Sequence, residues 1–547
     1  MNIDFVEQSL RDGQQSLWGM RLRAYEAAGA LPYLKDAGYR TIDLTGAGMF
    51  TVLLREYGDD PWATLDFLVA GLKGNELRSG LRTLSCVGFA PTPQAIMDLW
   101  IQTLIKHGST SFWLYDCLYD MDLMKHQVDV VRNAGGQPVP AIMYGLTDVH
   151  DDAYFADRAR QMASWEGVES IYVEDAAGIL KPERARTLLP AIRQATGDMP
   201  LELHCHNTTN MAQHNYIVGI ESGFTRIHTA SRPMANGPSL PSTEAMATIV
   251  EHLGREHTLD TSTFAPVAEH FEHVAREAGR ATGVPAEYDP RMYDHQLPGG
   301  MTGTLINQLE RHGMGHRFPE VLEAIPQVRV QLGSPIMATP FSQFVGVQAV
   351  LNIVTGKPYS MVSDEVIHYV LGHYGPVPSP IDPDVLDKIM SNPRTKQLQS
   401  WERPDPSLKE IRARFAPDIS DEELLIRFMM SDEEVDAMLA KGPLRVDRRR
   451  SSNNIVESSS ISSTLRPRVP RSPSRPRSSA CGLPGRRHDH SCRGLDPHGT
   501  DSRTDRSNGW KMTTSTRAHP RYRSFRVRSR GISQYRRPSR WKEARGH

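Results

Sequence analysis

Two histidines stand one residue apart in 201-LELHCHNTTN-210, where an apolar run gives way to polar residues. If this run is a β-strand, the alternation of side chains places His204 and His206 on the same face. Two imidazoles presented in this way can bind one metal ion. They can also be two histidines that are only hydrogen-bonded at the end of a strand. The residues that follow the other apolar runs decide between these interpretations.

Further charged residues come at the ends of other short apolar runs: Arg11, Asp12, Asp116, Glu174 and Asp175. If these runs are parallel strands of one barrel, their carboxyl ends meet at one mouth, and so do these side chains. Histidines combined with carboxylates, without nearby thiolates, are typical of sites for Zn, Mn or Co. The sequence therefore favours the metal interpretation.

Eight candidate strands recur along residues 1–290, each followed by a polar or glycine-containing turn. They are 2–8, 41–47, 81–89, 111–116, 138–145, 170–178, 201–207 and 225–231. Segments with helical periodicity lie between several of them, at 24–38, 93–108, 153–165, 181–197 and 210–223. This alternation predicts an α/β domain built as a (β/α)8 TIM barrel. The alternative is a Rossmann-like sheet, although no GxGxxG turn follows the first strand.

Residues 291–446 lack the alternation of strands and helices and show helical segments separated by proline-rich breaks such as YGPVPSPIDP. They predict a mainly helical extension that packs beside the barrel. The methionine-rich helices of this part are typical of a packed core.

The last part of the chain is chemically distinct. Residues 451–547 hold 22 Lys and Arg against 6 Asp and Glu, whereas the rest of the chain holds 41 against 58. A Ser/Arg/Pro-rich segment with few aliphatic residues cannot offset chain entropy by burial, so residues 447–547 are predicted to be a disordered tail. A solvated linker and a basic arm for nucleic acid are two interpretations. The excess of Arg without any repeat favours a third, a gene read out of frame after about residue 446, and no nucleic-acid function is assigned.

Cysteine usage and hydropathy indicate the compartment. The five cysteines form no CxxC pair and no even framework, which suits reducing conditions. The N-terminus lacks the pattern of a signal peptide, and no apolar run approaches the roughly 18 residues that a membrane span needs. We expect a cytoplasmic protein without a membrane segment.

Six motifs occur in a characteristic order between about residues 3 and 440. They are EQSLRDGQQSLWGMRLR, SFWLYDCLYD, EDAAGILKP, LELHCHNTT, YDHQLPGGMTGTL and SPIMATPFSQFVG. This order resembles the carboxyltransferase domain shared by pyruvate carboxylase, the oxaloacetate decarboxylase alpha subunit and the transcarboxylase central subunit. The LPGGM segment is the most discriminating, because Claisen-type enzymes that share the barrel generally lack it.

The resemblance implies a divalent metal, Zn, Mn or Co, on Asp12, His204 and His206. It also implies that Gln15 and Asp116 lie near the reacting centre. The family moves CO2 between biotin and a small carbon acid, and metals of this kind stabilise the developing enolate. Arg11 would place its charge near that enolate oxygen, or would serve only as an ion-pair partner.

The resemblance also implies partners. The chain contains nothing similar to a biotinyl domain or to an ATP-grasp domain. Biotin would therefore be supplied in trans on a biotin carboxyl carrier protein, which a separate biotin carboxylase would load. The family further suggests a homodimer.

Three positions depart from the family pattern. Glu174 stands where the family has a carbamylated lysine, and its carboxylate would bind the metal directly. Pro238 replaces a proton-shuttling threonine, so that Ser239 is the nearest hydroxyl. Ser85 aligns with an arginine for the substrate carboxylate, and Arg82 lies three residues earlier, so a substrate other than pyruvate is expected.

Two other functions stay open from the sequence. A carbon–carbon lyase or a Claisen-type condensing enzyme would use the same metal site, with Asn236 as an additional ligand. A barrel without catalytic activity, retained as an assembly subunit of a carboxylase complex, is the second. Bound metal separates the last from the others, and dependence on biotin separates the carboxyltransferase from the lyase.

Overall fold

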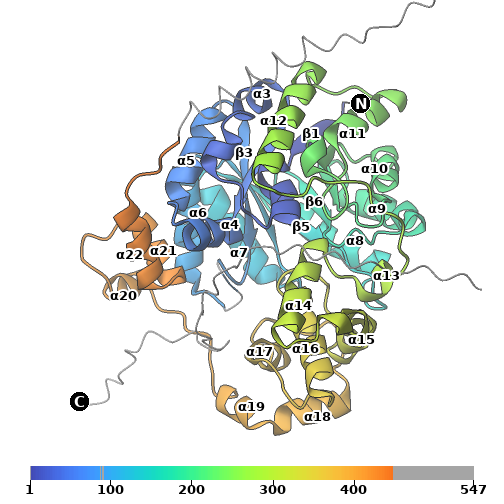
Figure 1. Ribbon diagram of the computed structural model, residues 1–547. Coiled ribbons are helices and arrows are strands. Elements are labelled where there is room, and N and C mark those ends of the chain that lie inside the picture. The colour runs from blue at the N-terminus through green and yellow to red at the C-terminus, as the bar shows by residue number, and fades with distance from the viewer. Residues whose placement is uncertain (1, 87, 89–90, 447–547) are drawn as a thin grey trace, which may run out of the picture. The chain divides into compact units, whose positions relative to one another are not determined.

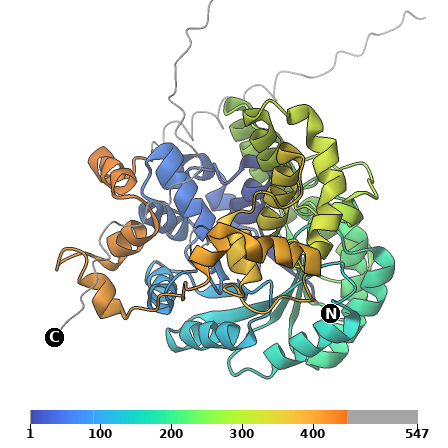
Figure 2. The same cartoon turned by 90° about the horizontal axis from the view of Figure 1, so that it is seen from below.

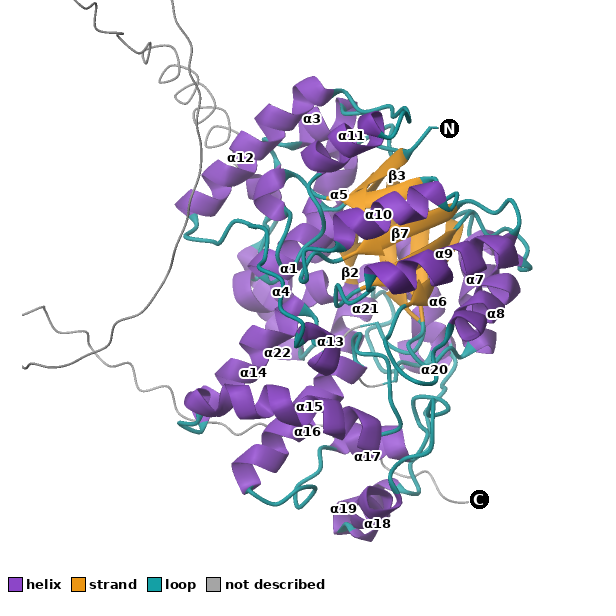
Figure 3. Cartoon of the chain, turned by 90° about the vertical axis from the view of Figure 1, so that its right-hand side faces the viewer, coloured by secondary structure: helices purple, strands orange, loops and turns teal. Residues whose placement is uncertain are grey.

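A computed structural model describes residues 2–86, 88 and 91–446 of this 547-residue chain. Within them, eight parallel strands close into a barrel in chain order, and β1 pairs with β8. Figure 3 shows the strands enclosed by helices. The (β/α)8 prediction is confirmed, and the open Rossmann-like alternative is wrong because the sheet closes on itself. The predicted disorder and reading-frame change of the tail concern residues outside the described ones.

The strands are short, and polar loops follow most of them. They are β1 (Asp4–Glu7), β2 (Thr41–Gly46), β3 (Glu76–Arg82), β4 (Ser111–Tyr115), β5 (Gln137–Met143), β6 (Ile171–Asp175), β7 (Leu201–Cys205) and β8 (Arg226–Thr229). Because all eight run in parallel, their carboxyl ends share one mouth.

Helices cover the outside of the barrel (Figure 1). They are α1 (Gln14–Trp18), α2 (Ala24–Ala27), α3 (Leu31–Asp36), α4 (Ala47–Tyr57), α5 (Pro61–Gly71), α6 (Gln94–Lys106), α7 (Met121–Asn133), α8 (Asp152–Ala163), α9 (Pro182–Thr196), α10 (Ala212–Glu221), α11 (Thr243–His252) and α12 (Phe264–Glu277). A five-residue π-helical turn, η1 (Ser9–Gly13), connects β1 to α1. The segment 24–38, predicted as one helix, is divided into α2 and α3.

The third strand lies earlier in the chain than the sequence predicts. The expected range is 81–89, whereas β3 spans Glu76–Arg82 and overlaps it at two residues. This strand reads ELRSGLR and shows no apolar run, because Arg78 is fully buried inside the barrel. Its guanidinium binds Glu202 of β7 at 2.5 and 3.1 Å. A buried charge that is neutralised by a distant strand hides the strand from hydrophobic pattern analysis.

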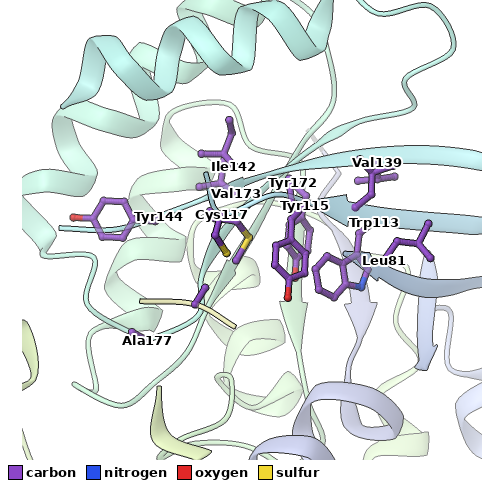
Figure 4. Packing of buried hydrophobic residues seen from close by; sticks show 14 of the residues in the cluster. Leu81, Trp113, Tyr115, Cys117, Val139, Ile142, Tyr144, Tyr172, Val173 and Ala177 are labelled. Atoms are coloured by element: carbon purple, nitrogen blue, oxygen red, sulfur yellow. The ribbon is translucent and has the colours of Figure 1, made fainter. Parts of the chain in front are cut away.

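An aromatic layer fills the barrel below the mouth (Figure 4). The ring of Trp113 stacks on Tyr115 and Tyr172, with centroid distances of 5.2 and 5.5 Å. Gly80 on the neighbouring strand makes room, since a Cβ there would lie 2.6 Å from the Trp113 ring. The guanidinium of Arg11 lies 4.8 Å from the centroid of the Trp113 ring. The packed aromatic layer is therefore in contact with the charged residues of the mouth through Arg11.

The predicted helical extension is confirmed, while its boundary at residue 290 stays a prediction. Its helices are α13 (Met292–His295), α14 (Gly299–Arg311), α15 (Phe318–Gln331), α16 (Phe341–Thr355), α17 (Asp364–Val370), α18 (Pro383–Ser391), α19 (Pro393–Leu398), α20 (Leu408–Arg412), α21 (Asp421–Met429) and α22 (Asp432–Lys441). None of the described helices is both long enough and apolar enough to span a membrane.

The extension contacts the carboxyl ends of the strands. The Thr339 carbonyl accepts a hydrogen bond from the Tyr115 hydroxyl at 3.3 Å and lies 3.5 Å from the Cys117 thiol. Figure 2 shows the extension in front of the barrel in a view from below. Further along the chain, α21 contacts α6 and α22 contacts α4. The helical extension therefore covers part of the mouth, where the site lies.

Candidate metal centre at the barrel mouth

Three predicted residues meet at the mouth. Asp12 lies in the π-helical turn after β1, His204 lies in β7, and His206 follows the last residue of that strand. Their potential ligand atoms all lie within 4.8 Å of one another. The Nε2 atoms of His204 and His206 are 3.4 and 3.5 Å from Asp12 Oδ2. The strand alternation predicted this shared direction of the two imidazoles.

Both imidazoles are held through their Nδ1 atoms. His206 Nδ1 donates to the carbonyl of Pro238 at 2.6 Å, and His204 Nδ1 lies 3.2 Å from His228 Nδ1. The Nε2 atom of His204 is buried and makes no hydrogen bond to the described residues, although it lies 3.4 Å from Asp12 Oδ2. An unpartnered buried nitrogen is costly unless something binds it. One carboxylate and two imidazoles whose Nε2 atoms converge suit Zn, Mn or Co, so these residues fit such an ion.

The electrostatics of this group favour a cation. Burial alone would raise the pKa of Asp12, but the Arg11 guanidinium and His206 hold it well below its usual range. Burial would lower the pKa of His206, but Asp12 raises it to about 9. Without a metal, a protonated His206 therefore pairs with an ionised Asp12, and a bound cation would displace the proton of His206.

Glu174 lies beside this group without belonging to it. In the register of β6 and β7 it is paired with His204. Its side chain is buried, and Oε2 has no hydrogen-bond partner within the described part of the chain. Burial raises the pKa of Glu174 to about 7, although Arg11 opposes this shift. The role of Glu174 as a fourth ligand stays a prediction.

Arg11 makes two buried ion pairs. Nη1 lies 2.7 Å from Asp12 Oδ2, and Nε lies 3.0 Å from Asp43 Oδ2. Its remaining nitrogen, Nη2, is buried and has no partner among the residues described. These contacts agree with the ion-pair interpretation, and Nη2 leaves one donor for an oxyanion.

Two residues expected near the reacting centre lie outside the metal-ligand group. Gln15 is exposed on α1, whereas the neighbouring Gln14 is fully buried. Asp116 is buried directly after β4, where its carboxylate accepts from Leu118 N at 2.8 Å and from the Thr83 hydroxyl. Their catalytic roles stay predictions.

The loop that follows β8 contacts the metal-ligand group through the Pro238 carbonyl, which accepts from His206. The Ser239 hydroxyl is buried and donates to the Met234 carbonyl at 2.7 Å, so it is engaged within its own loop. Asn236 adopts a left-handed conformation with φ of 69°, and its Oδ1 accepts from Asn207 at 3.1 Å. These contacts leave the proposed roles of Ser239 and Asn236 as predictions.

The LPGGM segment packs against this loop. A Cβ atom on Gly299 would lie 2.3 Å from Pro238 Cβ, so only glycine permits the close approach. The Pro238 carbonyl in turn holds His206. The LPGGM motif therefore lies against the proline whose carbonyl accepts from His206.

A pocket at the ends of β3 and β4 contains Arg82 but none of the proposed metal ligands. It lies between these strand ends and the extension. Arg82 and Ser85 both line it, together with Asp116. Arg82 is the last residue of β3, on the same face as the inward-pointing Arg78. Because the sequence predicts the third strand at 81–89, Arg82 was not expected at the carboxyl end of a strand.

A barrel with this site belongs to the class of (β/α)8 enzymes that carry their chemistry at the mouth, and known proteins narrow the class. The family described as "Conserved carboxylase domain" matches residues 292–441, and the family described as "HMGL-like" matches residues 116–270. The carboxyl transferase domain of Rhizobium etli pyruvate carboxylase has a similar fold, with a TM-score of 0.71 and 24% identity. That match covers 80% of this chain and 77% of the other.

Two relatives in sequence are similar over most of their length. A pyruvate carboxylase subunit of Methanocaldococcus jannaschii is 30% identical over 390 residues, which are 71% of this chain and 68% of the relative. The 2-oxoglutarate carboxylase large subunit of Hydrogenobacter thermophilus is 27% identical over 439 residues, 79% and 67% of the two chains. The chain belongs to the carboxyltransferase family of the biotin-dependent carboxylases, as its motifs predict.

Proposed function

We propose that this chain transfers a carboxyl group between biotin on a separate protein and a small carbon acid, with a divalent metal ion at the barrel mouth. The observation that carries this proposal is the convergence of Asp12, His204 and His206, with the unpartnered Nε2 of His204 among them. A bound Zn, Mn or Co ion would act as a Lewis acid that polarises a substrate oxygen. Glu174 is proposed as an additional carboxylate ligand.

The residues around this centre have distinct proposed tasks. The Pro238 carbonyl orients His206, and Arg11 fixes Asp12 while its free Nη2 faces developing negative charge. Ser239 is the nearest hydroxyl to the position of the family's threonine, but its present bond to Met234 would have to break before it could move a proton. Gln15 and Asp116 are proposed to border the substrate.

The proposed substrate class is a carbon acid that bears a carboxylate. Arg82 lines the same pocket as Ser85, and its guanidinium donates to the carbonyls of Cys86 and Gly88 at 3.0 Å. A substrate carboxylate would have to replace these carbonyls as the acceptor of a bidentate pair. The relatives named above are carboxylases of pyruvate and of 2-oxoglutarate, which supports a 2-oxo acid. The replacement at Ser85 is the reason to expect an acid other than pyruvate.

The proposed partners follow from the organisation of the relatives. Both are named as subunits of carboxylases, which supports work alongside other chains. We propose a biotin carboxyl carrier protein and a biotin carboxylase as those partners, with a homodimer of this chain in the cytoplasm.

The lyase remains the second candidate because of one observation. Asn236 lies in the loop that holds His206, and within the described structure its side-chain oxygen accepts a single hydrogen bond, from Asn207. This oxygen would have to leave Asn207 to become the additional ligand. An assembly subunit without activity is the third candidate.

A biotin-dependence assay separates the three candidates. The full chain, loaded with Zn2+ or Co2+, is incubated with oxaloacetate or oxalosuccinate, with and without free biotin, and CO2 release is followed. We expect release that requires biotin and is lost in His204→Ala. Release that needs His204 but not biotin would support the lyase. No release by a chain that also binds no metal would support the assembly subunit.

A further inference from the structure

A chain of hydrogen bonds leads from His204 into the barrel. His228 of β8 is fully buried, and its Nδ1 lies 3.2 Å from His204 Nδ1. On the other side of the ring, His228 Nε2 lies 3.0 Å from Glu202 Oε2. Gln8 Nε2 lies 2.9 Å from His228 Nδ1. These contacts involve no residue that the sequence analysis selected apart from His204.

The Glu202 carboxylate can only accept in this arrangement. It receives two hydrogen bonds from Arg78, at 2.5 and 3.1 Å, and one from Arg226 at 3.0 Å. Two buried guanidinium groups keep it ionised, so the proton between Glu202 and His228 resides on His228 Nε2.

The position of the proton on His228 determines which nitrogen of His204 carries a proton. A neutral imidazole with its proton on Nε2 has an acceptor at Nδ1. The amide of Gln8 donates to this acceptor, and the same amide nitrogen faces Asp43 Oδ2 at 3.2 Å, which can only accept. Two unprotonated nitrogens at 3.2 Å would repel each other, so His204 Nδ1 donates to His228 Nδ1 and shares that acceptor with Gln8. This leaves the lone pair of His204 on Nε2, although Asp12 Oδ2, 3.4 Å from Nε2, is a competing acceptor when no metal is bound.

We propose that His228 is a positioning residue that, with Glu202, fixes the tautomer and the ring orientation of His204. This inference rests on the proposed metal site, because it concerns how His204 presents Nε2 to a cation beside Asp12. The His204 and His228 rings meet at 71° with their centroids 5.1 Å apart, so His228 supports the ring as well as its proton. The Pro238 carbonyl does for His206 what His228 does for His204.

The two histidines are anchored differently. A backbone carbonyl holds His206 and cannot be removed by a side-chain substitution, whereas His204 depends on His228. Partners of metal-binding histidines typically contribute 10–100-fold to metal affinity. Removing the acceptor at position 228 should therefore weaken metal binding while leaving every proposed ligand in place.

The test compares His228→Leu with His228→Asn in the full chain. Zn2+ and Co2+ affinities are measured by chelator competition, and the unfolding of the metal-free proteins is followed in parallel. We expect roughly 10–100-fold weaker binding in His228→Leu and a clear recovery in His228→Asn, whose side-chain carbonyl can accept from His204. A folded His228→Leu protein with unchanged affinity would overturn the proposal.

A matched control separates positioning from general destabilisation. His270 is also a buried histidine, with Nε2 bonded to the Glu26 carbonyl at 2.7 Å, and is in none of these contacts. His270→Leu should lower stability without changing the affinity for Zn2+ or Co2+. Equal weakening in both leucine variants would also contradict a positioning role.

A measurement on the metal-free wild type needs no folded variant at position 228. Histidine ¹⁵N chemical shifts report the tautomer, and His204→Ala assigns the signal. We expect the proton of neutral His204 on Nδ1, and finding it on Nε2 would overturn the inference. If the wild type bound neither Zn2+ nor Co2+, the proposed metal site would fail, while this measurement would still decide the role of His228.

Discussion

Charged side chains are buried at two levels of the barrel. The inner cluster lies in the interior, and the mouth cluster lies at the carboxyl ends of the strands. The inner cluster consists of Arg78, Glu202, Arg226 and His228. The mouth cluster consists of Arg11, Asp12, Glu174, His204 and His206. Both clusters combine carboxylates with guanidinium and imidazole groups.

The clusters differ in how completely their polar atoms are paired. No buried side-chain nitrogen or oxygen of the inner cluster lacks a partner among the described residues. In the mouth cluster, Arg11 Nη2, Glu174 Oε2 and His204 Nε2 make no hydrogen bond to the described residues, and His204 Nε2 only approaches Asp12 Oδ2 at 3.4 Å. Buried polar atoms are almost always paired, so a group of unpaired ones indicates where something binds. Gln8 Oε1 and Asp43 Oδ1, on residues that contact His228 and Arg11, are also unpaired among the described residues. The difference between the clusters supports the proposal that the inner cluster stabilises the barrel and that the mouth cluster carries the chemistry.

Removing a cation from the inner cluster should have the largest effect on stability. Arg78→Met takes the bidentate partner from Glu202 and leaves a buried carboxylate undercompensated. Losses of this kind cost about 3–5 kcal/mol. We expect the free energy of unfolding, measured in urea at neutral pH, to fall by about that amount.

The matched control for Arg78→Met lies in the mouth cluster. Glu174→Gln removes a carboxylate whose Oε2 has no partner in the described structure, so its effect on unfolding should be much smaller. A larger loss in Glu174→Gln than in Arg78→Met would reverse the assignment of the two clusters.

Glu7 is a third kind of buried carboxylate, which belongs to neither cluster and accepts hydrogen bonds from the backbone. It accepts from Ser9 N at 2.7 Å, and burial raises its pKa from 4.5 to about 7. Between these values the folded state binds more protons than the unfolded state, so stability falls as pH rises from about 4.5 to 7. Glu7→Gln should remove this contribution, on the order of 3 kcal/mol.

Urea unfolding of wild type and Glu7→Gln at pH 5 and pH 8 checks this expectation. Relative to the wild type, the variant should gain stability at the higher pH. Parallel pH profiles of the two proteins would mean that Glu7 does not carry the raised pKa.

Much of the fold was predictable because most strands carry their own signal. The runs around Val173 and Leu203 are apolar, and polar residues mark their ends, so β6, β7 and the mouth side chains could be located from the sequence. The third strand could not, because Arg78 is buried only by virtue of Glu202 on another strand. That error also hid Arg82 at the end of β3.

The metal-ligand group of the candidate site could be predicted from the sequence, whereas the residues that support it were harder to predict. The spacing of His204 and His206 predicts that both side chains point to the same face of the strand. Asp12 lies close to them because the carboxyl ends of parallel strands share one mouth. Support from His228 could not be predicted in the same way, because a hydrogen bond between two side chains depends on the closure of the barrel. A histidine at the end of β8 was the available signal.

The metal content of the purified protein shows whether the mouth cluster binds an ion. Elemental analysis is performed on the full chain after reconstitution with Zn2+, Mn2+ or Co2+, with His204→Ala and the matched control His270→Ala beside the wild type. The account predicts about one ion per chain in the wild type and in His270→Ala, and loss of that ion in His204→Ala. A wild type without metal, or a His204→Ala variant that retains it, would contradict the assignment of the mouth cluster.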